Sequence, residues 1–452
     1  MGLTYRAAWL IGVLCASTAW SAPIAVEVML PPTLVDAEGD RNVFATTFAY
    51  RDGQLFTVHV EPAGAGGQPG INLRTVVRKG VRKPGAGWVW ESSVIEARTL
   101  SDTWHTQASI ALDKEGFVHV AYNMHNMPWQ YSVSTHPLDI SSFEFRGQAI
   151  TEVERQAVKF QNKTPFPDAG TASIPGNQVT YPMFFTDRQG DIYLTYRFAL
   201  KPAQGWDKRA FAGAIAKYDV MTKQWRPIGG AVAVSTADAR PVGGKGGTSY
   251  QPFAFEDGYS VYLITLAFDG ENGMHVFWNW RRGGAGMDTT RPSYAFSPDG
   301  AHFYRSNGQT YSLPIRYEEA ESIGPTALHT RYYAPKSATT LHNGEPLVVL
   351  HPLTGGRQML RFDKKAGKWV DPEPSPAGAS EIVADLLGRQ WAFATGLRVF
   401  MRTSSSEPWE EVGQVGTNLC SPKVQYVAAE SRFIVHAKSC DGKQATIVSF
   451  RR

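Results

Sequence analysis

Hydrophobic and polar positions alternate over short stretches of the chain, and one unit recurs. Each unit has a strand, an acidic or Asn-containing turn that ends in Gly, and a second strand rich in β-branched and aromatic residues. In the clearest unit, residues 108–122, the turn is Asp113-Lys114-Glu115-Gly116. Similar units lie at residues 183–196, 269–280, 339–350 and 382–393, and weaker ones at 50–60 and 433–449. The pattern predicts seven β-hairpins.

No segment has a sustained helical period, and no linker rich in Pro and Ser divides the chain. Seven hairpins over about 430 residues leave about 60 residues for each, which is enough for a four-stranded blade. We therefore expect an all-β fold, a seven-bladed β-propeller of four-stranded antiparallel blades, in a single domain over residues 23–452.

The composition supports this fold class. The 452 residues include 43 Gly and 28 Pro, which interrupt helices, and 13 Trp, 18 Tyr and 23 Phe, which favour strands. The 45 Lys and Arg residues nearly balance the 41 Asp and Glu residues, and only 19% of the residues are charged. These values argue against a disordered polar chain and against a strongly basic nucleic-acid-binding protein.

The N-terminus has the order of a secretory signal: Arg6, then an apolar run at residues 7–16, then small residues. The apolar run is shorter than the roughly 20 residues that cross a bilayer, and no later segment is long enough. Cys15 follows the bulky Leu14, which disfavours lipidation. We expect residues 1–22 to be removed and the mature protein to be soluble, secreted or periplasmic, and not bound to a membrane.

Two cysteines remain after the signal, Cys420 and Cys440. In an oxidising compartment, a pair separated by 20 residues favours a disulfide over the alternative of two buried thiols. Neither cysteine has a His at catalytic or zinc-ligand spacing, so the sequence does not predict thiol chemistry.

Candidate chemistry lies at the ends of the predicted strands. Pairs of His, Tyr and Arg residues bracket three neighbouring hairpins: His105 and His125, Tyr181 and Arg197, and Tyr250 and Arg281. A chain that runs out and returns places both members of a pair at one end of the sheet, so we expect all six at one rim of the propeller. Taken singly, a His or Tyr at a strand end is more often a packing residue; the repeated bracketing favours a site.

Other polar residues favour structural roles. We interpret His119, Tyr193 and His275 as packing residues because they lie in the middle of strands. Asp113 and Asp187 lie in the hairpin turns, at the opposite end from the predicted rim, and are interpreted as turn formers rather than as a glycosidase carboxylate pair. The chain also has no phosphate-binding glycine loop, GxSxG, HExxH or CxxC motif.

Four segments resemble the BNR-repeat propeller group that includes ulvan lyases and related rhamnose–glucuronate lyases. They are Asp102-Thr103-Trp104-His105 through Asn123-Met124-His125-Asn126, Thr180-Tyr181-Pro182 with Tyr196-Arg197, residues 274–281, and residues 293–300. Residues 297–303 also resemble a degenerate Asp-box turn of sialidase-like propellers. The resemblance covers about residues 45–355 and depends mainly on the spacings His-x19-His and Tyr-x15-Arg.

The resemblance implies a seven-bladed propeller that cleaves uronic-acid-containing polysaccharides by β-elimination. It places His105, His125, Tyr181, Arg197 and Tyr250 at the catalytic positions of the family, with Tyr250 expected to position the sugar. The predicted substrate-binding residues are Tyr250, Arg281, Arg291 and Asn123. Residues 288–292 depart from the expected turn, which leaves the identity of the substrate open.

These residue types suit β-elimination from a uronate. A guanidinium binds a carboxylate in a bidentate manner, so Arg197 is predicted to neutralise the uronate. His125 is predicted to stabilise the enolate-like intermediate, His105 to act as the base and Tyr181 as the acid, with the reverse assignment of His105 and Tyr181 left open. No cofactor is required by this chemistry, and the sequence does not address a structural metal ion.

Two other functions remain open at this point: a glucuronate-directed α-L-rhamnosidase-type hydrolase, and a non-catalytic glycan-binding propeller. In each case the expected partner is an anionic polysaccharide, with no nucleic acid, and we expect a monomer. Because the net charge is only +4, recognition of the polymer would depend on a local cluster such as Arg197, Arg281, Arg282 and Arg291.

Overall fold

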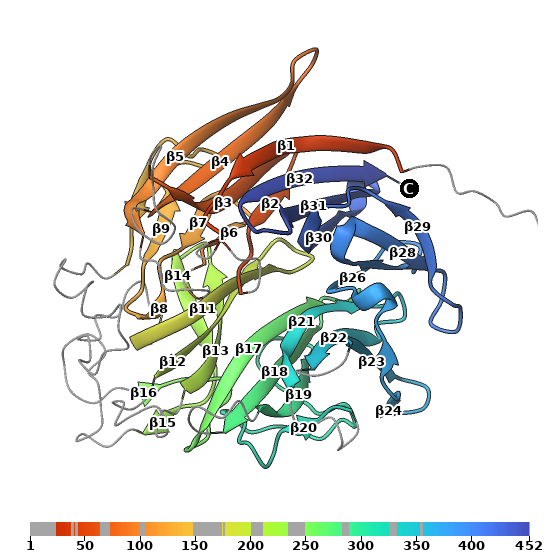
Figure 1. The fold of residues 1–452 in the computed structure, drawn as a ribbon. Helices are drawn as coiled ribbons and strands as arrows, with labels where there is room; N and C mark the ends of the chain where they lie inside the picture. The colour runs from red at the N-terminus through yellow and green to blue at the C-terminus, as the bar shows by residue number, and fades with distance from the viewer. Residues whose placement is uncertain are drawn as a thin grey trace, which may run out of the picture.

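The computed structural model describes residues 24–37, 40, 44–63, 73–99, 105, 107–147, 174, 177–199, 211–233, 249–282, 289–324, 332–352 and 356–451. The predicted signal segment, residues 1–22, therefore lies outside the described residues. The described residues form seven antiparallel sheets of four or five strands, arranged in a ring (Figure 1). The prediction of a seven-bladed β-propeller with four-stranded blades is confirmed.

Each blade is named here from its innermost strand outward. Blade 1 consists of β2 (Phe48–Arg51), β3 (Gln54–Pro62), β4 (Leu73–Lys83) and β5 (Gly87–Thr99). Blade 2 consists of β6 (Ser109–Leu112), β7 (Val118–Ala121), β9 (Tyr131–Ser134) and β10 (Phe143–Phe145). Blade 3 consists of β11 (Asn177–Thr186), β12 (Ile192–Ala199), β13 (Phe211–Asp219) and β14 (Gln224–Ile228).

Blade 4 consists of β17 (Tyr259–Phe268), β18 (Met274–Arg282), β19 (Thr289–Ser297) and β20 (Glu321–Ser322). Blade 5 consists of β21 (Tyr332–Thr340), β22 (Pro346–Pro352) and β23 (Gln358–Asp363), with β24 (Lys368–Trp369) and β25 (Glu373–Pro374) both paired to β23. Blade 6 consists of β26 (Glu381–Ala384), β27 (Gln390–Phe393), β28 (Arg398–Arg402) and β29 (Glu410–Gln414).

Blade 7 joins the two ends of the described chain. Its inner strands are β30 (Leu419–Val427), β31 (Arg432–Ser439) and β32 (Gln444–Arg451), and its outermost strand is β1 (Val26–Leu34), which pairs antiparallel with β32. Three short strands lie outside this scheme: β8 (His125–Met127), β15 (Val232–Ala233) and β16 (Ser249–Tyr250). Within the described ranges the helical residues are confined to the 3-10 turns Pro376–Gly378, Thr395–Leu397 and Ala428–Glu430, and no helix is long and apolar enough to cross a membrane.

In the tight turns of blades 2 and 3, Asp113 and Asp187 have the predicted role of turn formers. The Oδ1 of Asp113 accepts hydrogen bonds from the backbone N–H groups of Glu115 and Phe117, and Asp187 does the same for Gln189 and Asp191. Gly116 has φ 93°, a conformation that a residue with a Cβ adopts at a cost. Blade 7 differs in which hairpin the repeat unit forms. The unit at residues 433–449 forms the hairpin between the second and third strands of the blade, β31 and β32, and the first and second strands, β30 and β31, are connected by the 3-10 turn Ala428–Glu430.

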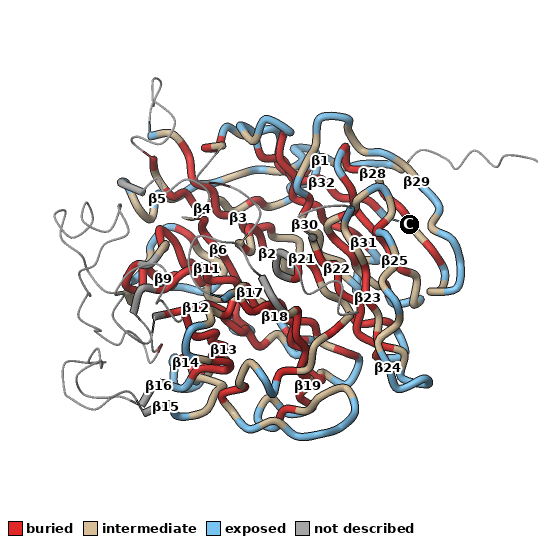
Figure 2. The backbone as a smooth tube through the Cα atoms, turned by 60° about the horizontal axis from the view of Figure 1, so that its bottom comes forward, coloured by how far each residue is buried: buried red, intermediate tan, exposed pale blue. Residues whose placement is uncertain are grey.

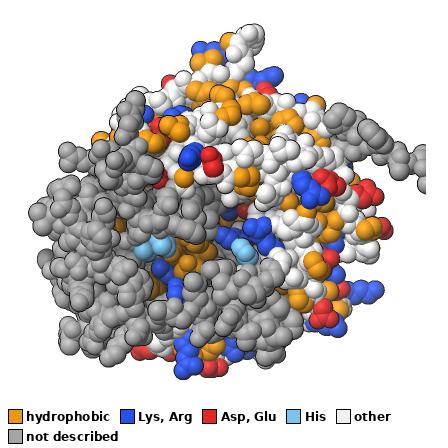
Figure 3. All heavy atoms as spheres, in the orientation of Figure 1, with side chains coloured by type: hydrophobic (Ala, Val, Ile, Leu, Met, Phe, Trp, Pro, Cys, Tyr) orange, Lys and Arg blue, Asp and Glu red, His pale blue; other side chains and the backbone are white. Residues whose placement is uncertain are grey.

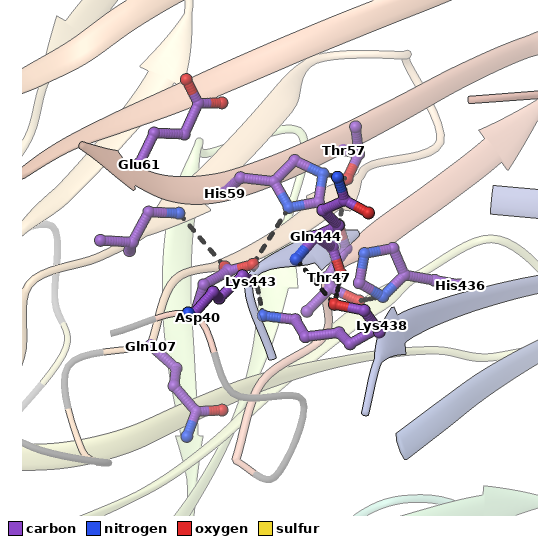
Figure 4. A network of polar contacts seen from close by, with 12 residues as sticks. Asp40, Thr47, Thr57, His59, Glu61, Gln107, His436, Lys438, Lys443 and Gln444 are labelled. Atoms are coloured by element: carbon purple, nitrogen blue, oxygen red, sulfur yellow. Dashed lines mark hydrogen bonds and ion pairs between the residues drawn. The ribbon is translucent and has the colours of Figure 1, made fainter. Parts of the chain in front are cut away.

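A buried polar network connects blade 7 to blade 1 (Figure 4). The Asp40 carboxylate accepts a hydrogen bond from Lys438 Nζ at 2.5 Å and lies 3.2 Å from His59 Nδ1. Nearby, His436 Nδ1 lies 3.2 Å from Thr47 Oγ1. The Asp40–Lys438 pair therefore ties β31 to the chain that enters blade 1, where the ring closes.

The apolar core consists of layers between neighbouring blades. Trp129, Tyr131 and Trp225 are almost fully buried between blades 2 and 3, and Trp278 and Trp280 are fully buried between blades 3 and 4. Each large aromatic side chain removes roughly 150–250 Å² from water. In Figure 2 the buried segments follow the strands and the exposed ones lie mainly in the connections. This layering accounts for the many aromatic residues in the composition.

Two further features bear on the site. Cys420 and Cys440 form a disulfide within blade 7, with their Cα atoms 5.0 Å apart. The innermost strand of every blade lines a central cavity of about 410 Å³. The face of the propeller where innermost strands begin and second strands end is called the site face below, and the opposite one, which carries the tight turns of Asp113 and Asp187, the turn face.

Candidate active site

A cluster of His, Tyr and Arg side chains lies on the site face between blades 2, 3 and 4. In Figure 3, the centre of the face shown is a hollow where His, Lys and Arg side chains surround hydrophobic ones. His105 precedes β6, His125 begins β8, Tyr181 lies in β11, and Arg197 lies in β12. The structure thus brings these four predicted residues to one end of two neighbouring blades.

The two predicted histidines stack on each other. Their ring centroids are 4.1 Å apart with an interplanar angle of 11°. The ring of Tyr181 lies 5.9 Å from His105 and 6.2 Å from His125. This proximity has a backbone cause, because β8 pairs with β11 and places His125 opposite Thr180. The two histidines of blade 2 therefore lie next to the innermost strand of blade 3.

Tyr181 lies at an irregularity in β11. Its φ is 57°, and the register of β11 against β12 shifts between Thr180 and Met183. A bulge re-aims a side chain, and a non-glycine residue in the left-handed region stores backbone strain, which is found most often at functional sites. Leu263 in β17 has the same feature, with φ 48° beside a register shift. Blades 3 and 4 therefore share this distortion on the site face.

The environment of Tyr181 keeps its phenol protonated. The side chain is buried, and burial raises its pKa well above 10, as does the neighbouring Tyr262, while Arg197 and Arg281 act in the opposite direction. The pKa therefore remains raised despite two nearby cations. At neutral pH the hydroxyl of Tyr181 is a proton donor rather than a base.

Arg197 packs among aromatic rings. Its guanidinium carbon lies 4.6 Å from the ring centroid of Tyr181, 4.5 Å from that of Phe211 and 5.1 Å from that of Tyr262. The residue is only 8% exposed, and its Nε is buried without a hydrogen-bond partner. Cation–π contacts favour this position, but they leave the N–H donors of the guanidinium available for a ligand.

Arg281 provides a second cation beside the same rings. Its guanidinium carbon lies 6.0 Å from the Tyr262 ring centroid, and its Nε is also buried without a partner. Within the described part of the chain, neither Arg197 nor Arg281 forms an ion pair with an acidic side chain. Two guanidinium groups without carboxylate partners make this part of the site suited to an anion.

The expected bracketing of a hairpin by Tyr250 and Arg281 is wrong. The first strand of that hairpin is β17, which begins at Tyr259, whereas Tyr250 lies in β16 and pairs with Val232 of β15. Residues 257–273, which such a hairpin would need as its connection, contain β17, the innermost strand of blade 4. The side chain of Tyr250 lies outside the described residues, so its predicted role stays a prediction.

Tyr262, which the sequence reasoning missed, contacts Tyr181 instead. The two rings meet edge to face with centroids 5.6 Å apart. A signal was present: Tyr262 precedes Arg281 across one hairpin as Tyr181 precedes Arg197 across another. Phe44, which precedes blade 1, was also missed; its ring centroid lies 4.4 Å from that of Tyr181. No local pattern around Phe44 indicates this contact, because it depends on the closure of the ring.

Two other predicted substrate-binding residues have structural contacts. Asn123 is buried, with φ 56°, in the connection between β7 and β8 that leads to His125. Arg291 donates a hydrogen bond to the backbone carbonyl of Tyr317, and its guanidinium carbon lies 4.6 Å from the Tyr317 ring centroid. The contacts described for Arg291 do not include the Tyr181–Arg197 cluster.

The mid-strand histidines have structural partners. His119 is buried and lies within hydrogen-bonding distance of Tyr131 and Asp113, and His275 is buried with its Nδ1 2.8 Å from the hydroxyl of Tyr294. Among the residues that the structure describes, no group of three or more His, Cys, Asp or Glu side chains is placed to hold a metal ion.

The comparison with known protein families agrees with this architecture. The family model described as BNR repeat-containing family member matches residues 73–375, which is more than half of the chain. The chain belongs to the BNR repeat-containing family. No curated protein sequence matches it.

Solved structures with the same fold include polysaccharide lyases. The crystal structure of polysaccharide lyase Uly1 is 12% identical, with a TM-score of 0.63 and 90% of each chain covered. A PL25 ulvan lyase bound to -[GlcA(1-4)Rha3S]- is 11% identical, with a TM-score of 0.53 and coverage of 92% of this chain and 95% of that chain. At these identities the likeness establishes the shared propeller fold.

Proposed function

We propose that this propeller is a polysaccharide lyase that cleaves rhamnose-(1,4)-glucuronate linkages by β-elimination, as in ulvan, and leaves a 4,5-unsaturated uronate end. The observation that carries the proposal is the pair Arg197 and Arg281, two cations without acidic partners in the described structure, beside a buried protonated Tyr181 and the stacked His105 and His125. The fold shared with ulvan lyases supports the choice of substrate.

The two arginines serve the first requirement of the reaction. A uronate carboxylate resists removal of the C5 proton, because the resulting carbanion adds negative charge to an anion. Arg197 binds the carboxylate and Arg281 adds a second positive charge, so that the enolate-like intermediate is stabilised. His125 donates a hydrogen bond to the same intermediate.

Proton transfer uses His105 and Tyr181. A neutral imidazole of His105 accepts the C5 proton, and the electrons of the C5–H bond form the C4–C5 double bond as the C4–O4 bond breaks. The protonated Tyr181 gives its proton to the departing O4. The raised pKa of Tyr181 supports this assignment over the reverse one, because a phenol that resists ionisation is a poor base at neutral pH. A proton then returns from His105 to Tyr181, directly or through water, to restore the site.

The two alternative functions predict different products. A hydrolase would produce reducing ends without a double bond, and a glycan-binding propeller would produce neither. The contacts described around His105, Tyr181 and Arg197 include no carboxylate, whereas most glycosidases use a pair. Near-UV absorbance during incubation with ulvan tests the proposal: a rise supports the lyase, and new reducing ends without a rise contradict it.

The proposal extends to the place of action. After removal of residues 1–22, the mature protein would be a secreted or periplasmic monomer and would meet extracellular polysaccharide directly. The disulfide between Cys420 and Cys440 is compatible with an oxidising compartment.

A further inference from the structure

A second group of cations lies on the site face at blade 5, which is separated by blade 4 from blade 3 and Arg197. It consists of Lys336 in β21, His351 near the end of β22 and Arg357 immediately before β23, and is called the blade 5 cluster below. Lys423 in β30 and Glu381 in β26 lie next to it, and Lys336, Lys423 and Glu381 all line the central cavity. None of these residues has a part in the chemistry proposed above.

The positive charge of this region exceeds its negative charge. Lys423 Nζ lies 3.0 Å from Glu381 Oε1, so the carboxylate that the described structure places beside the cluster already has a partner. Among the described residues, Lys336 has no hydrogen-bond or ion-pair partner. Arg357 donates one N–H to the carbonyl of Gly378, but its Nε is buried without a partner. In the described part of the chain, neither Lys336 nor Arg357 therefore forms an ion pair with an acidic side chain.

The titration of the cluster reflects this imbalance. Burial, followed by the charges of Lys423 and Arg357, lowers the pKa of Lys336 to about 7, although Glu381 acts in the opposite direction. Burial and the charges of Arg357 and Lys336 likewise lower the pKa of His351 to about 4. A bound anion would reverse the effect on Lys336, because it favours the charged ammonium form.

Phe44 connects the cluster to the candidate active site. Lys336 Nζ lies 5.5 Å from the ring centroid of Phe44, and that ring lies 4.4 Å from the ring of Tyr181. Phe44 therefore lies between Lys336 and Tyr181, and the rings of Phe44 and Tyr181 together connect Lys336 to Arg197. Because both groups lie on the site face and are connected by these contacts, we expect anionic groups on different sugars of one polysaccharide to reach both.

We propose that Lys336 and Arg357, with His351 beside them, form an oxyanion subsite that holds a sulfate ester or carboxylate of a glycan residue other than the uronate being cleaved. The inference rests on the proposed polysaccharide substrate and assigns it a second point of attachment. Lys336 and Arg357 then act in substrate binding, and not in proton transfer.

The first test uses inorganic sulfate and does not require catalysis. The ε-CH2 signal of Lys336 is assigned by its loss in Lys336→Met and followed by NMR as sodium sulfate replaces sodium chloride at constant ionic strength. The expected result is a saturable shift of this signal and a rise of the Lys336 pKa from about 7 to roughly 8 or higher. The absence of a saturable shift would overturn the proposal.

The second test compares native and desulfated ulvan. Lys336→Met should raise KM about tenfold with little change in kcat, whereas Lys365→Met, an exposed lysine that follows β23 toward the turn face, should leave KM unchanged. If Lys336→Met raises KM more on native than on desulfated ulvan, the subsite binds sulfate. If KM rises equally on both polymers, the subsite binds a carboxylate. An unchanged KM on both polymers would overturn the proposal. If the wild-type protein cleaves neither, the proposed function fails and the NMR titration alone decides the subsite.

Discussion

The guanidinium carbon of Arg197 lies 4.6 Å from the ring centroid of Tyr181. The cation that would neutralise the uronate therefore packs on the side chain whose hydroxyl would donate the proton. Arg197→Lys keeps the charge but loses the planar, bidentate donor geometry. We expect kcat/KM on ulvan to fall by about 10²-fold or more, since the bidentate hydrogen bonds that would stabilise the charge of the transition state are lost. Steady-state absorbance kinetics measure the effect. Arg226→Lys, at an exposed arginine of β14, serves as the control, and equal activities of the two variants would contradict the role of Arg197.

Removal of the Tyr181 hydroxyl tests the acid. Tyr181→Phe keeps the ring that packs on Phe44 and Arg197, so the fold should persist. Elimination should slow by roughly 10²- to 10⁴-fold, the usual contribution of a general acid. Tyr304→Phe, at a half-buried tyrosine of blade 4, provides a matched control. Full activity of Tyr181→Phe would show that another group protonates O4.

His105 offers a complementary test of the base. His105→Ala should lower kcat by a similar factor while KM changes little, because the imidazole acts on the C5 proton rather than on binding. His136→Ala, at an exposed histidine of blade 2, is the matched control. Retention of wild-type kcat by the His105 variant would remove His105 from the proposed reaction.

The Asp40 network predicts how stability depends on pH. Burial acts to raise the pKa of Asp40, but Lys438 and His59 together hold it below its usual value. Because the folded pKa is below the unfolded value of about 4, this contribution to stability is present above about pH 4 and is lost as the pH falls further. Asp40→Asn should lower the free energy of unfolding at pH 7 by roughly 3–5 kcal/mol, since it leaves Lys438 buried without its partner.

Chemical denaturation of the wild type and Asp40→Asn at several pH values measures this. The difference between the two proteins should shrink as the pH falls below about 4. Asp371→Asn, at an exposed aspartate, should match the wild type throughout. A difference between wild type and Asp40→Asn that stayed constant down to acid pH would show that the charge of Asp40 does not stabilise the closure.

The disulfide of blade 7 should stabilise the fold without affecting the site. The double substitution Cys420→Ser and Cys440→Ser releases a loop with a sequence separation of 20 residues. The expected loss is about 3 kcal/mol in the free energy of unfolding, with kcat and KM unchanged. The wild type with reductant should have the same lowered midpoint of thermal unfolding as the variant. Equal midpoints for the oxidised wild type, the reduced wild type and the variant would contradict the prediction.

The blades could be predicted from sequence because local turn chemistry repeats. Asp113 and Asp187 bind the backbone of their own turns, so the pattern in the sequence corresponds directly to a hairpin. The positions of His125, Tyr181 and Arg197 followed from the same out-and-back geometry. Apart from the pairing of β8 with β11, these features depend on contacts between residues that are close in sequence.

The remaining parts of the site depend on contacts that no local pattern encodes. The predicted hairpin between Tyr250 and Arg281 does not indicate Tyr262, because it leaves β17 out as its first strand. The approach of Tyr262 to Tyr181 also involves the register shift next to Leu263. Phe44 and Lys336 are far apart in the chain and meet only after blade 1 and blade 5 are placed around the central cavity. Closure of the ring, rather than the sequence of any one blade, brings them together.

The elimination reaction is tested by near-UV absorbance during incubation of the purified protein with ulvan. Wild-type protein should give a steady rise from the new C4–C5 double bond, with a rate at least about 10²-fold lower in Tyr181→Phe and in Arg197→Lys. Accumulation of reducing ends without absorbance, or an absorbance rise of equal rate in all three proteins, would contradict a lyase that uses Tyr181 and Arg197.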